Sequence, residues 1–269
     1  MLKIAVAGAR GRMGSRIAAL SGEYENVVLA GALEQKGHPD TGKDISALLG
    51  LSGPSVQISD DINTVLAGAD VLIDFTYPAS TLSNLRACIE NGKGMVIGTT
   101  GFSGEELEEI SRLFSAPKVP CVKAANMSMG INLLLKIVRD MARALDDEYD
   151  VEIIEAHHRH KKDAPSGTAL MLARSAAEGL GRDLDKTAVY ARKGMIGERS
   201  KGEIGIQTIR AGDIVGEHTV MFGGLGERIE VTHKASSRDT FARGALRAAI
   251  WLQGKKPGLY DMQDVLGLK

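Results

Sequence analysis

The 269-residue chain has few cysteines, few aromatic side chains (4%) and no surplus of either charge. It has two cysteines, Cys88 and Cys121, and no CxxC spacing, which argues against a disulfide scaffold or a cysteine metal site. The formal net charge of −1 argues against a nucleic-acid or acidic-membrane binder, because these usually carry a basic surplus. No apolar run approaches the ~20 residues of a membrane span. We therefore expect a cytoplasmic protein without metal, nucleic-acid or membrane partners.

Short apolar runs alternate with amphipathic stretches through the first half of the chain. Near-continuous runs of Val, Ile, Leu and Ala are typical of strands buried on both faces of a parallel sheet. We expect strands at 4–7, 27–33, 71–75, 95–98 and 119–124, with helices at 14–21, 80–91 and 104–114 between them. Strand followed by helix, repeated, predicts an α/β fold with a Rossmann-type, doubly wound parallel sheet.

The pattern changes after Asn126. Helices are expected at 131–145 and 168–180, with a strand at 151–156, and three strands with glycine-containing links then follow at 203–210, 216–222 and 227–233. This predicts a second, α+β domain built on an open, mostly antiparallel sheet. We place the Rossmann domain at 1–126 and the second domain at 127–236. The last segment, 237–269, contains a helix at 239–252 and is expected to pack back on the first domain.

Three glycines, Gly8, Gly11 and Gly14, follow the first strand and open the first helix. Glycines here permit a tight turn and a close approach of the backbone to a pyrophosphate, whose charge the helix N-terminus stabilises. Glu34 lies ~20 residues beyond, where a carboxylate accepts hydrogen bonds from ribose hydroxyls. The context favours a dinucleotide site over the alternative, a structural turn with a solvated Glu34.

The cofactor type is left open by these residues. A carboxylate at Glu34 favours NADH because it repels the extra phosphate of NADPH, whereas Arg12 and Lys36 offset that repulsion. Two later strand ends, at 74–78 and 98–102, carry small and hydroxyl side chains that suit a nicotinamide ribose and carboxamide. The alternative for each is an ordinary strand-to-helix loop.

The segment 155–169 places three histidines and three basic residues at the end of one strand and in the loop that opens a helix. A zinc site is one interpretation, which the adjacent cations disfavour. A solvated charged loop is another. The third is an anion-binding, proton-donating site, with backbone N–H groups at a helix N-terminus and His and Lys side chains as proton donors. We favour the third.

This segment resembles the signature of the dihydrodipicolinate reductase family. The similarity runs through essentially the whole chain, including the glycine loop 8–14, the strand ends at 74–76, 98–102 and 124–126, and the segments 210–218 and 234–238. The resemblance implies a homotetrameric, NADH- or NADPH-dependent oxidoreductase that reduces a cyclic dicarboxylate, 4-hydroxy-tetrahydrodipicolinate, in the diaminopimelate route to lysine. The tetramer would form on the sheet of the second domain.

The resemblance also implies roles for individual residues. His157 and Lys161 would be catalytic, and His158, Ser166, Gly167 and Thr168 would bind the substrate. Gln35 stands where some members of the family carry arginine, which puts a strong preference for NADPH in doubt. The residues expected to hold the cofactor are Gly8, Ala9, Arg10, Gly11, Arg12, Met13, Glu34, Lys36, Phe75, Gly98, Thr99, Thr100, Ala124, Ala125, Asn126, Met127 and Arg238.

Two rival functions remain at this point. A Rossmann dehydrogenase acting on an aspartate-derived linear amino acid would also need to hold two carboxylates. A non-catalytic NAD(H)-sensing regulator would need no His157–Lys161 cluster, and it would typically carry a nucleic-acid-binding helix pair, of which the sequence gives no sign.

Overall fold

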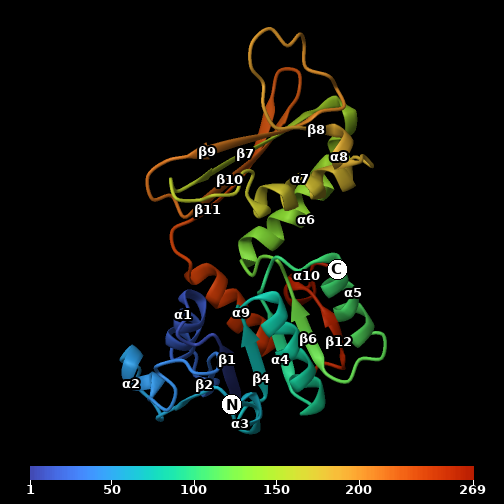
Figure 1. Ribbon diagram of the computed structural model, residues 1–269. Coiled ribbons are helices and arrows are strands. Elements are labelled where there is room, and N and C mark those ends of the chain that lie inside the picture. The colour runs from blue at the N-terminus through green and yellow to red at the C-terminus, as the bar shows by residue number, and fades with distance from the viewer. The chain divides into compact units, whose positions relative to one another are not determined.

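A computed structural model describes residues 1–269 as two compact units. The first unit combines residues 1–129 with 239–269, and the second spans 130–238 (Figure 1). Each unit has a hydrophobic core of its own. No helix is both long and apolar enough to cross a membrane.

A seven-stranded parallel sheet forms the centre of the first unit, in the order β12-β6-β5-β4-β1-β2-β3. The chain first builds outward from β1 to β3, then returns to the other side of β1 with β4, which makes β1 and β4 the switch point of the sheet. The strands are β1 Leu2–Ala7, β2 Val27–Leu33, β3 Ile58–Ser59, β4 Val71–Asp74, β5 Gly94–Ile97, β6 Pro120–Lys123 and β12 Gly258–Tyr260.

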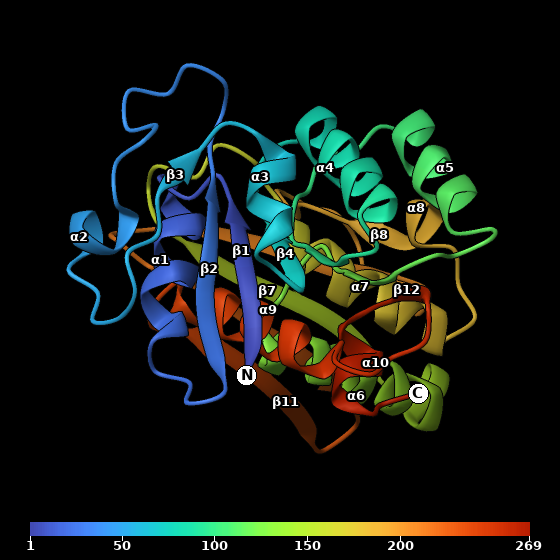
Figure 2. The same ribbon diagram turned by 90° about the horizontal axis from the view of Figure 1, so that it is seen from below.

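Helices cover both faces of this sheet (Figure 2). Alternate residues of β1 enter different cores: Ile4 and Val6 pack with α1 and α9, whereas Ala5 and Ala7 pack with α3, α4 and α5. The doubly wound α/β fold predicted from the apolar runs is therefore confirmed. The helices are α1 Arg12–Ser21, α2 Ile45–Leu49, α3 Ile62–Ala67, α4 Pro78–Glu90, α5 Gly104–Leu113, α9 Asp239–Trp251 and α10 Met262–Leu266.

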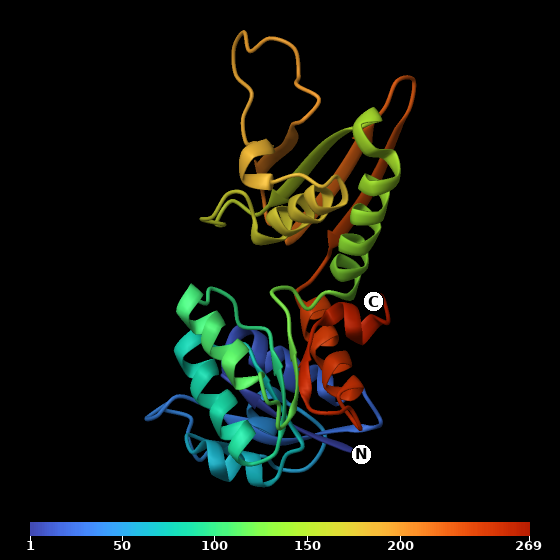
Figure 3. The same ribbon diagram turned by 90° about the vertical axis from the view of Figure 1, so that its right-hand side faces the viewer.

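The second unit is an open five-stranded sheet in the order β11-β10-β7-β9-β8. Its two long helices, α6 and α7, pack on one face around a single apolar core (Figure 1). The loop between β8 and β9 extends away from these helices (Figure 3). The elements are α6 Met129–Leu145, a 3-10 turn at Asp146–Glu148, β7 Asp150–His157, α7 Gly167–Gly179, α8 Leu184–Thr187, β8 Ala188–Val189, β9 Ile204–Arg210, β10 Gly216–Gly223 and β11 Arg228–Ala235.

The open sheet of the second domain was predicted correctly, and most of its paired residues are antiparallel, but the parallel direction of β9 was not predicted. The sheet is mixed: β10 pairs antiparallel with β7 and β11, whereas β9 pairs parallel with β7 and β8. The reason is the helical crossover between β7 and β9. Helices α7 and α8 carry the chain back to the end of the sheet where β7 begins, so β9 runs in the same direction as β7.

Candidate active site

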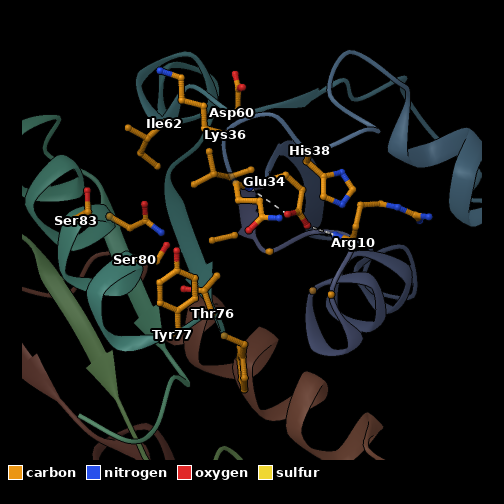
Figure 4. Close-up of a pocket in the computed structure, with 18 of the residues that line it drawn as sticks. Arg10, Glu34, Lys36, His38, Asp60, Ile62, Thr76, Tyr77, Ser80 and Ser83 are labelled. Carbon is orange, nitrogen blue, oxygen red and sulfur yellow. Dashed lines mark hydrogen bonds between the residues drawn. The ribbon is translucent and has the colours of Figure 1, made fainter. Parts of the chain in front are cut away.

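A cavity of about 840 Å³ lies at the carboxyl ends of β1, β2 and β4 in the first unit (Figure 4). In an open α/β sheet this edge of the switch point is where ligands bind. The lining includes most of the predicted residues on these three strand ends: Gly8, Arg10, Gly11, Arg12, Met13, Glu34, Lys36 and Phe75. Sequence reasoning did not assign His38, Asp60 or Ser80, which also line the cavity, as does Tyr77 of the predicted strand end 74–78.

The glycine loop has the geometry that a pyrophosphate needs. Gly8 has a φ of +64°, and a Cβ on Gly14 would lie 2.0 Å from the Gly8 carbonyl oxygen, so a side chain at position 14 is excluded. Gly11 caps helix α1 without any side-chain hydrogen bond to the first-turn N–H groups. These N–H groups and the positive end of the helix dipole suit an anion, so the residues fit the cofactor's diphosphate.

Glu34 follows β2 and is fixed by the loop opposite. Its carboxylate accepts hydrogen bonds from the backbone N–H of Arg10, at 2.7 Å, and of Gln35, at 3.1 Å. Each carboxylate oxygen can accept a second hydrogen bond, which leaves capacity for the two hydroxyls of a ribose. The position of Glu34 therefore fits the adenosine end of a dinucleotide.

The cations near Glu34 are not equivalent. Arg10 donates to Asp40 at 2.8 Å, and Lys43 also donates to Asp40, at 2.7 Å. Hydrogen bonds from Lys43 and Arg10 lower the pKa of Asp40. Arg12 and Lys36 are exposed and line the cavity. The positive charge that would offset the repulsion between Glu34 and the 2′-phosphate of NADPH therefore comes from Arg12 and Lys36 rather than from Arg10.

The remaining predicted cofactor residues lie outside the cavity lining. Ala9 is buried under the loop, where its N–H donates to the Leu33 carbonyl. Residues 98–100 and 124–127 follow β5 and β6 at the same edge of the sheet, and a Cβ on Gly98 would lie 2.2 Å from the Phe75 ring. Arg238 is different, because it is the exposed last residue of the second unit.

A buried carboxylate that sequence reasoning did not assign ties these strand ends together. Asp74 ends β4 with no exposed surface, and it accepts hydrogen bonds from the Thr76 N–H and hydroxyl at 2.8 and 2.6 Å. It also accepts from Asn84 at 2.8 Å and from Thr99 at 3.3 Å. The loops after β4 and β5 are thus held by one side chain, a contact that no local sequence motif predicts.

In the second unit, His157 ends β7 beside a second buried carboxylate, Glu155. The His157 Nδ1 lies 2.6 Å from Glu155 Oε2. Arg210 of β9 donates to both oxygens of Glu155, at 2.8 and 2.9 Å, and the Ser166 N–H donates at 3.0 Å. Glu155 has no exposed surface and His157 is 8% exposed. The predicted catalytic histidine is therefore part of a buried ion-pair network.

The network shifts the pKa values of its members. Burial alone would raise the pKa of Glu155, but hydrogen bonds from Arg210, His157 and the Ser166 N–H lower it to about 2. Burial lowers the pKa of His157, and the positive charges of Lys161 and Arg210 lower it further, against the opposing effect of Glu155. The Glu155 carboxylate is thus ionised at neutral pH and His157 titrates below its ordinary value.

Ser166 caps helix α7 and is already engaged within the fold. Its hydroxyl accepts from the Ala169 N–H at 3.1 Å and lies 3.1 Å from Nε2 of His218, a residue without an assigned role in the sequence prediction. Burial, together with the neighbouring His157, lowers the pKa of His218 to about 4. Gly167, which follows, is exposed and begins the helix, so its N–H and that of Thr168 are placed at the anion-binding end of α7.

Lys161 and His158 lie in the loop between β7 and α7. Lys161 pairs with the exposed Asp163 at 2.9 Å, and its own side chain is 20% exposed. His158 is held by its backbone N–H, which donates to the Ile214 carbonyl at 2.7 Å. His157, His158 and Lys161 therefore lie at the end of β7 and in the loop that leads into the N-terminus of α7.

Cys88 and Cys121 are buried free thiols in the first unit, and burial raises the pKa of Cys88 to about 12. No group of three His, Cys, Asp or Glu side chains is arranged to hold a metal ion.

The fold and the first cavity define a Rossmann-type oxidoreductase of the NAD(P)H-dependent kind. The family profiles described as "Dihydrodipicolinate reductase, N-terminus" and "Dihydrodipicolinate reductase, C-terminus" match residues 2–127 and 130–266. The chain therefore belongs to the dihydrodipicolinate reductase family.

Individual relatives agree with this assignment. The chain is 57% identical to a protein of Syntrophobacter fumaroxidans and 56% identical to one of Geotalea daltonii, each over 100% of both chains and each named 4-hydroxy-tetrahydrodipicolinate reductase. A dipicolinate-bound dihydrodipicolinate reductase from Paenisporosarcina sp. TG-14 superposes with a TM-score of 0.75 at 26% identity, covering 98% of this chain and 99% of that one. A probable dehydrogenase from Thermotoga maritima shares only the fold, with a TM-score of 0.63 at 11% identity.

Proposed function

We propose that the chain reduces 4-hydroxy-tetrahydrodipicolinate to tetrahydrodipicolinate with NADH or NADPH, in the diaminopimelate route to lysine. The observation that carries this proposal is the His157–Glu155–Arg210 network beside Lys161 and the N-terminus of α7. It combines a buried proton carrier with an anion site in one loop. The relatives that share the chain's full length carry the name of this activity.

The first unit holds the cofactor in this proposal. The N–H groups at the start of α1 bind the diphosphate, and Glu34 binds the hydroxyls of the adenosine ribose. When bound, the reduced nicotinamide supplies the hydride. The loops after β4, β5 and β6, which contain Phe75, 98–100 and 124–127, hold the nicotinamide end. Lys36 and Arg12 allow a 2′-phosphate, so both cofactors are used.

The second unit holds the substrate, a small dicarboxylate. The N–H groups of Gly167 and Thr168 bind one carboxylate at the positive end of the α7 dipole. Lys161 and His158 add side-chain donors for the second carboxylate. Ser166 supports this site through its cap of α7 and its contact with His218. The structural relative with dipicolinate bound supports a dicarboxylate as the ligand class.

His157 and Lys161 supply the proton that balances hydride addition. The ring of His157 is held beside Glu155, and Lys161 offers an ammonium in a partly exposed loop. A positioned acid of this kind contributes typically 10²–10⁴-fold in rate.

The protein works as a cytoplasmic homotetramer in this proposal. The face of the second sheet opposite α6 and α7 carries exposed and half-buried side chains, among them Ile154, Met221 and Ile209. The β8–β9 loop adds Met195, which is fully exposed. Apolar side chains gathered on one open sheet face are typical of an interface between copies of a chain. A cytoplasmic site agrees with the two buried free thiols.

The test follows the loss of reduced-nicotinamide absorbance while the preceding synthase generates substrate from pyruvate and aspartate semialdehyde. We expect rapid oxidation that depends on the synthase, with NADH and with NADPH. L-aspartate and NAD⁺ form a second arm, which tests the rival amino-acid dehydrogenase. Oxidation without the synthase, or turnover of aspartate instead, would contradict the proposed reaction.

A further inference from the structure

The carboxylate of Glu155 occupies a special place beside His157. The two residues stand two apart on β7, so both side chains project from the same face of the strand. Glu155 has no exposed surface, and its Oε2 lies 2.6 Å from His157 Nδ1. Burying a carboxylate away from solvent costs free energy. Neither solubility nor a surface ion pair therefore accounts for the position of Glu155.

We propose that Glu155, held in place by Arg210, is a positioning residue that keeps the Nδ1 of His157 protonated and leaves Nε2 as the atom that exchanges a proton with the substrate. This inference rests on the proposed role of His157 in proton transfer.

The hydrogen bonds of Glu155 allow only one arrangement of protons. Arg210 donates to both carboxylate oxygens, and the Ser166 N–H donates to Oε1. An ionised carboxylate only accepts hydrogen bonds, and the guanidinium of Arg210 keeps it ionised. The ring nitrogen that faces Oε2 must therefore carry the proton. A His157 tautomer with its proton on Nε2 would place two lone pairs against each other at 2.6 Å.

The surroundings of Nε2 fit a proton-exchanging atom. Gly216 of β10 lies next to it, and a Cβ at this glycine would approach Nε2 to 3.0 Å. The neighbouring His218 ring stands edge-on to His157 at 5.1 Å and uses its own Nε2 for the contact with Ser166. His218 is thus occupied in holding the start of α7, and His157 is the histidine left for proton exchange.

The charges around His157 act in opposite directions on its pKa. Burial lowers it, Glu155 raises it, and Lys161 and Arg210 lower it. The titratable and charged groups around the ring are Glu155 of β7, Arg210 of β9, His218 of β10 and Lys161 of the loop before α7. Behind them, Asp163 pairs with Lys161, and His233 of β11 lowers the pKa of His218. Removing Glu155 or Arg210 therefore shifts the titration of His157 in opposite senses.

Opposite shifts of the His157 titration in the Glu155 and Arg210 variants distinguish a positioning role from a purely structural one. The variants are Glu155→Gln, Glu155→Asp and Arg210→Met. The control is Glu152→Gln on the same strand, since Glu152 also forms a two-arginine network, with Arg192 and Arg199. Readouts are the pH dependence of kcat, the KM for the dicarboxylate, the Kd for NADH, and ¹⁵N NMR of histidine-labelled full-length protein, which reports the tautomer of each ring.

We expect Glu155→Gln to lower kcat about 10–100-fold, as for other residues that orient a functional histidine, with KM and the NADH Kd near wild type. As proton donor, His157 loses activity as pH rises through its pKa. This limb should move to lower pH in Glu155→Gln and to higher pH in Arg210→Met. Glu155→Asp should keep part of kcat, and Glu152→Gln should leave the position of the limb unchanged.

The NMR arm needs neither a folded variant nor turnover. Wild-type His157 should show a protonated Nδ1 at pH 7.5, and a protonated Nε2 with a bare Nδ1 would overturn the proposal. A limb of the kcat–pH profile that moves in the same direction in Glu155→Gln and Arg210→Met would overturn the proposal as well. Wild-type protein that keeps the Nδ1–H tautomer but does not reduce the substrate would instead refute the proposed function and leave the tautomer assignment standing.

Discussion

His157 and Lys161 of the second unit stand in different electrostatic surroundings. His157 is buried against an ionised carboxylate that is itself paired with Arg210. Lys161 is paired with Asp163, whose side chain is 63% exposed. An ion pair with so exposed a partner contributes little free energy, about 0–1 kcal/mol. Lys161 can therefore exchange Asp163 for an anionic ligand at small cost, whereas His157 is held in one place.

Replacing Lys161 by Ala, or His157 by Gln, should lower kcat about 10²–10⁴-fold, because each removes a positioned acid. The affinity for NADH should stay near wild type, since the proposed cofactor residues other than Arg238 lie in the first unit. Steady-state kinetics and NADH fluorescence titration measure the two quantities. Lys162→Ala is the matched control, because Lys162 is an exposed neighbour of the same charge. Wild-type turnover in either site variant would remove that residue from the mechanism.

Glu155 also links the stability of the protein to pH. Its pKa falls from 4.5 to about 2 on folding, so the ionised form stabilises the native state above pH 4.5. This contribution is lost as pH falls from 4.5 toward 2, because the unfolded chain binds the proton first. Relative to pH 7, the loss should reach about 2 kcal/mol at pH 3. Denaturant unfolding of wild type and Glu155→Gln at pH 7, 4 and 3 should show the gap between them narrowing; a constant gap would contradict the linkage.

Sequence reasoning placed the candidate residues in one loop but did not predict their partners. His157, Lys161 and Gly167 lie within eleven residues of one another, so their neighbourhood follows from chain connectivity alone. Arg210 is 55 residues from Glu155 and reaches it only because β9 pairs with β7 in register, with His157 opposite Arg210. A contact that depends on strand pairing leaves no local signal, and the same holds for Thr99 and Asp74, 25 residues apart.

At the scale of elements, the start of helix α1 depends on a glycine contact. Gly14 packs against the Gly8 carbonyl so closely that a Cβ would lie 2.0 Å from the oxygen, and the obstructing atom is backbone. Gly14→Ala should therefore displace the glycine loop from the helix and weaken NADH binding at least 100-fold, since the loop N–H groups no longer converge on the diphosphate. Isothermal titration with NADH measures this effect.

Gly104 provides the matched control for that change. It is the first residue of α5, and nothing lies within 4 Å of the position a Cβ would take. Gly104→Ala should bind NADH like the wild type. Tight binding by Gly14→Ala would mean that the loop tolerates the displacement and that the close contact is not what shapes the site.

Complete burial on both faces explains why three strands could be predicted from apolar runs alone. Strands β1, β4 and β5 read as apolar runs because both of their faces are covered. The edge strands β3 and β12, of two and three residues, are too short to produce a pattern. The direction of β9 could not be predicted from the sequence either, because a strand with alternating burial has the same hydrophobic pattern whether its neighbour runs parallel or antiparallel.

At the scale of the whole molecule, the two units leave different surfaces free for ligands. The first unit is a sheet covered on both faces, so its free surface for ligands is the edge where the strands end. The second unit covers only one face of its sheet, so it offers both an edge and an open face. The edge carries the His157 loop, and the open face is the one proposed above as the contact between copies of the chain.

The homotetramer proposed for this face can be tested by one substitution. Ile154 of β7 projects from the open face, between Thr219 of β10 and Gln207 of β9 in register. Ile154→Glu should leave the fold of the unit intact, because the side chain points away from the apolar core, but it would bury a charge wherever two such faces meet. Sedimentation velocity should show a four-chain particle for the wild type and smaller species for the variant. Leu107→Glu, on the exposed surface of α5 in the first unit, should remain a tetramer. A tetrameric Ile154→Glu would place the interface elsewhere, and a monomeric wild type would refute the assembly itself.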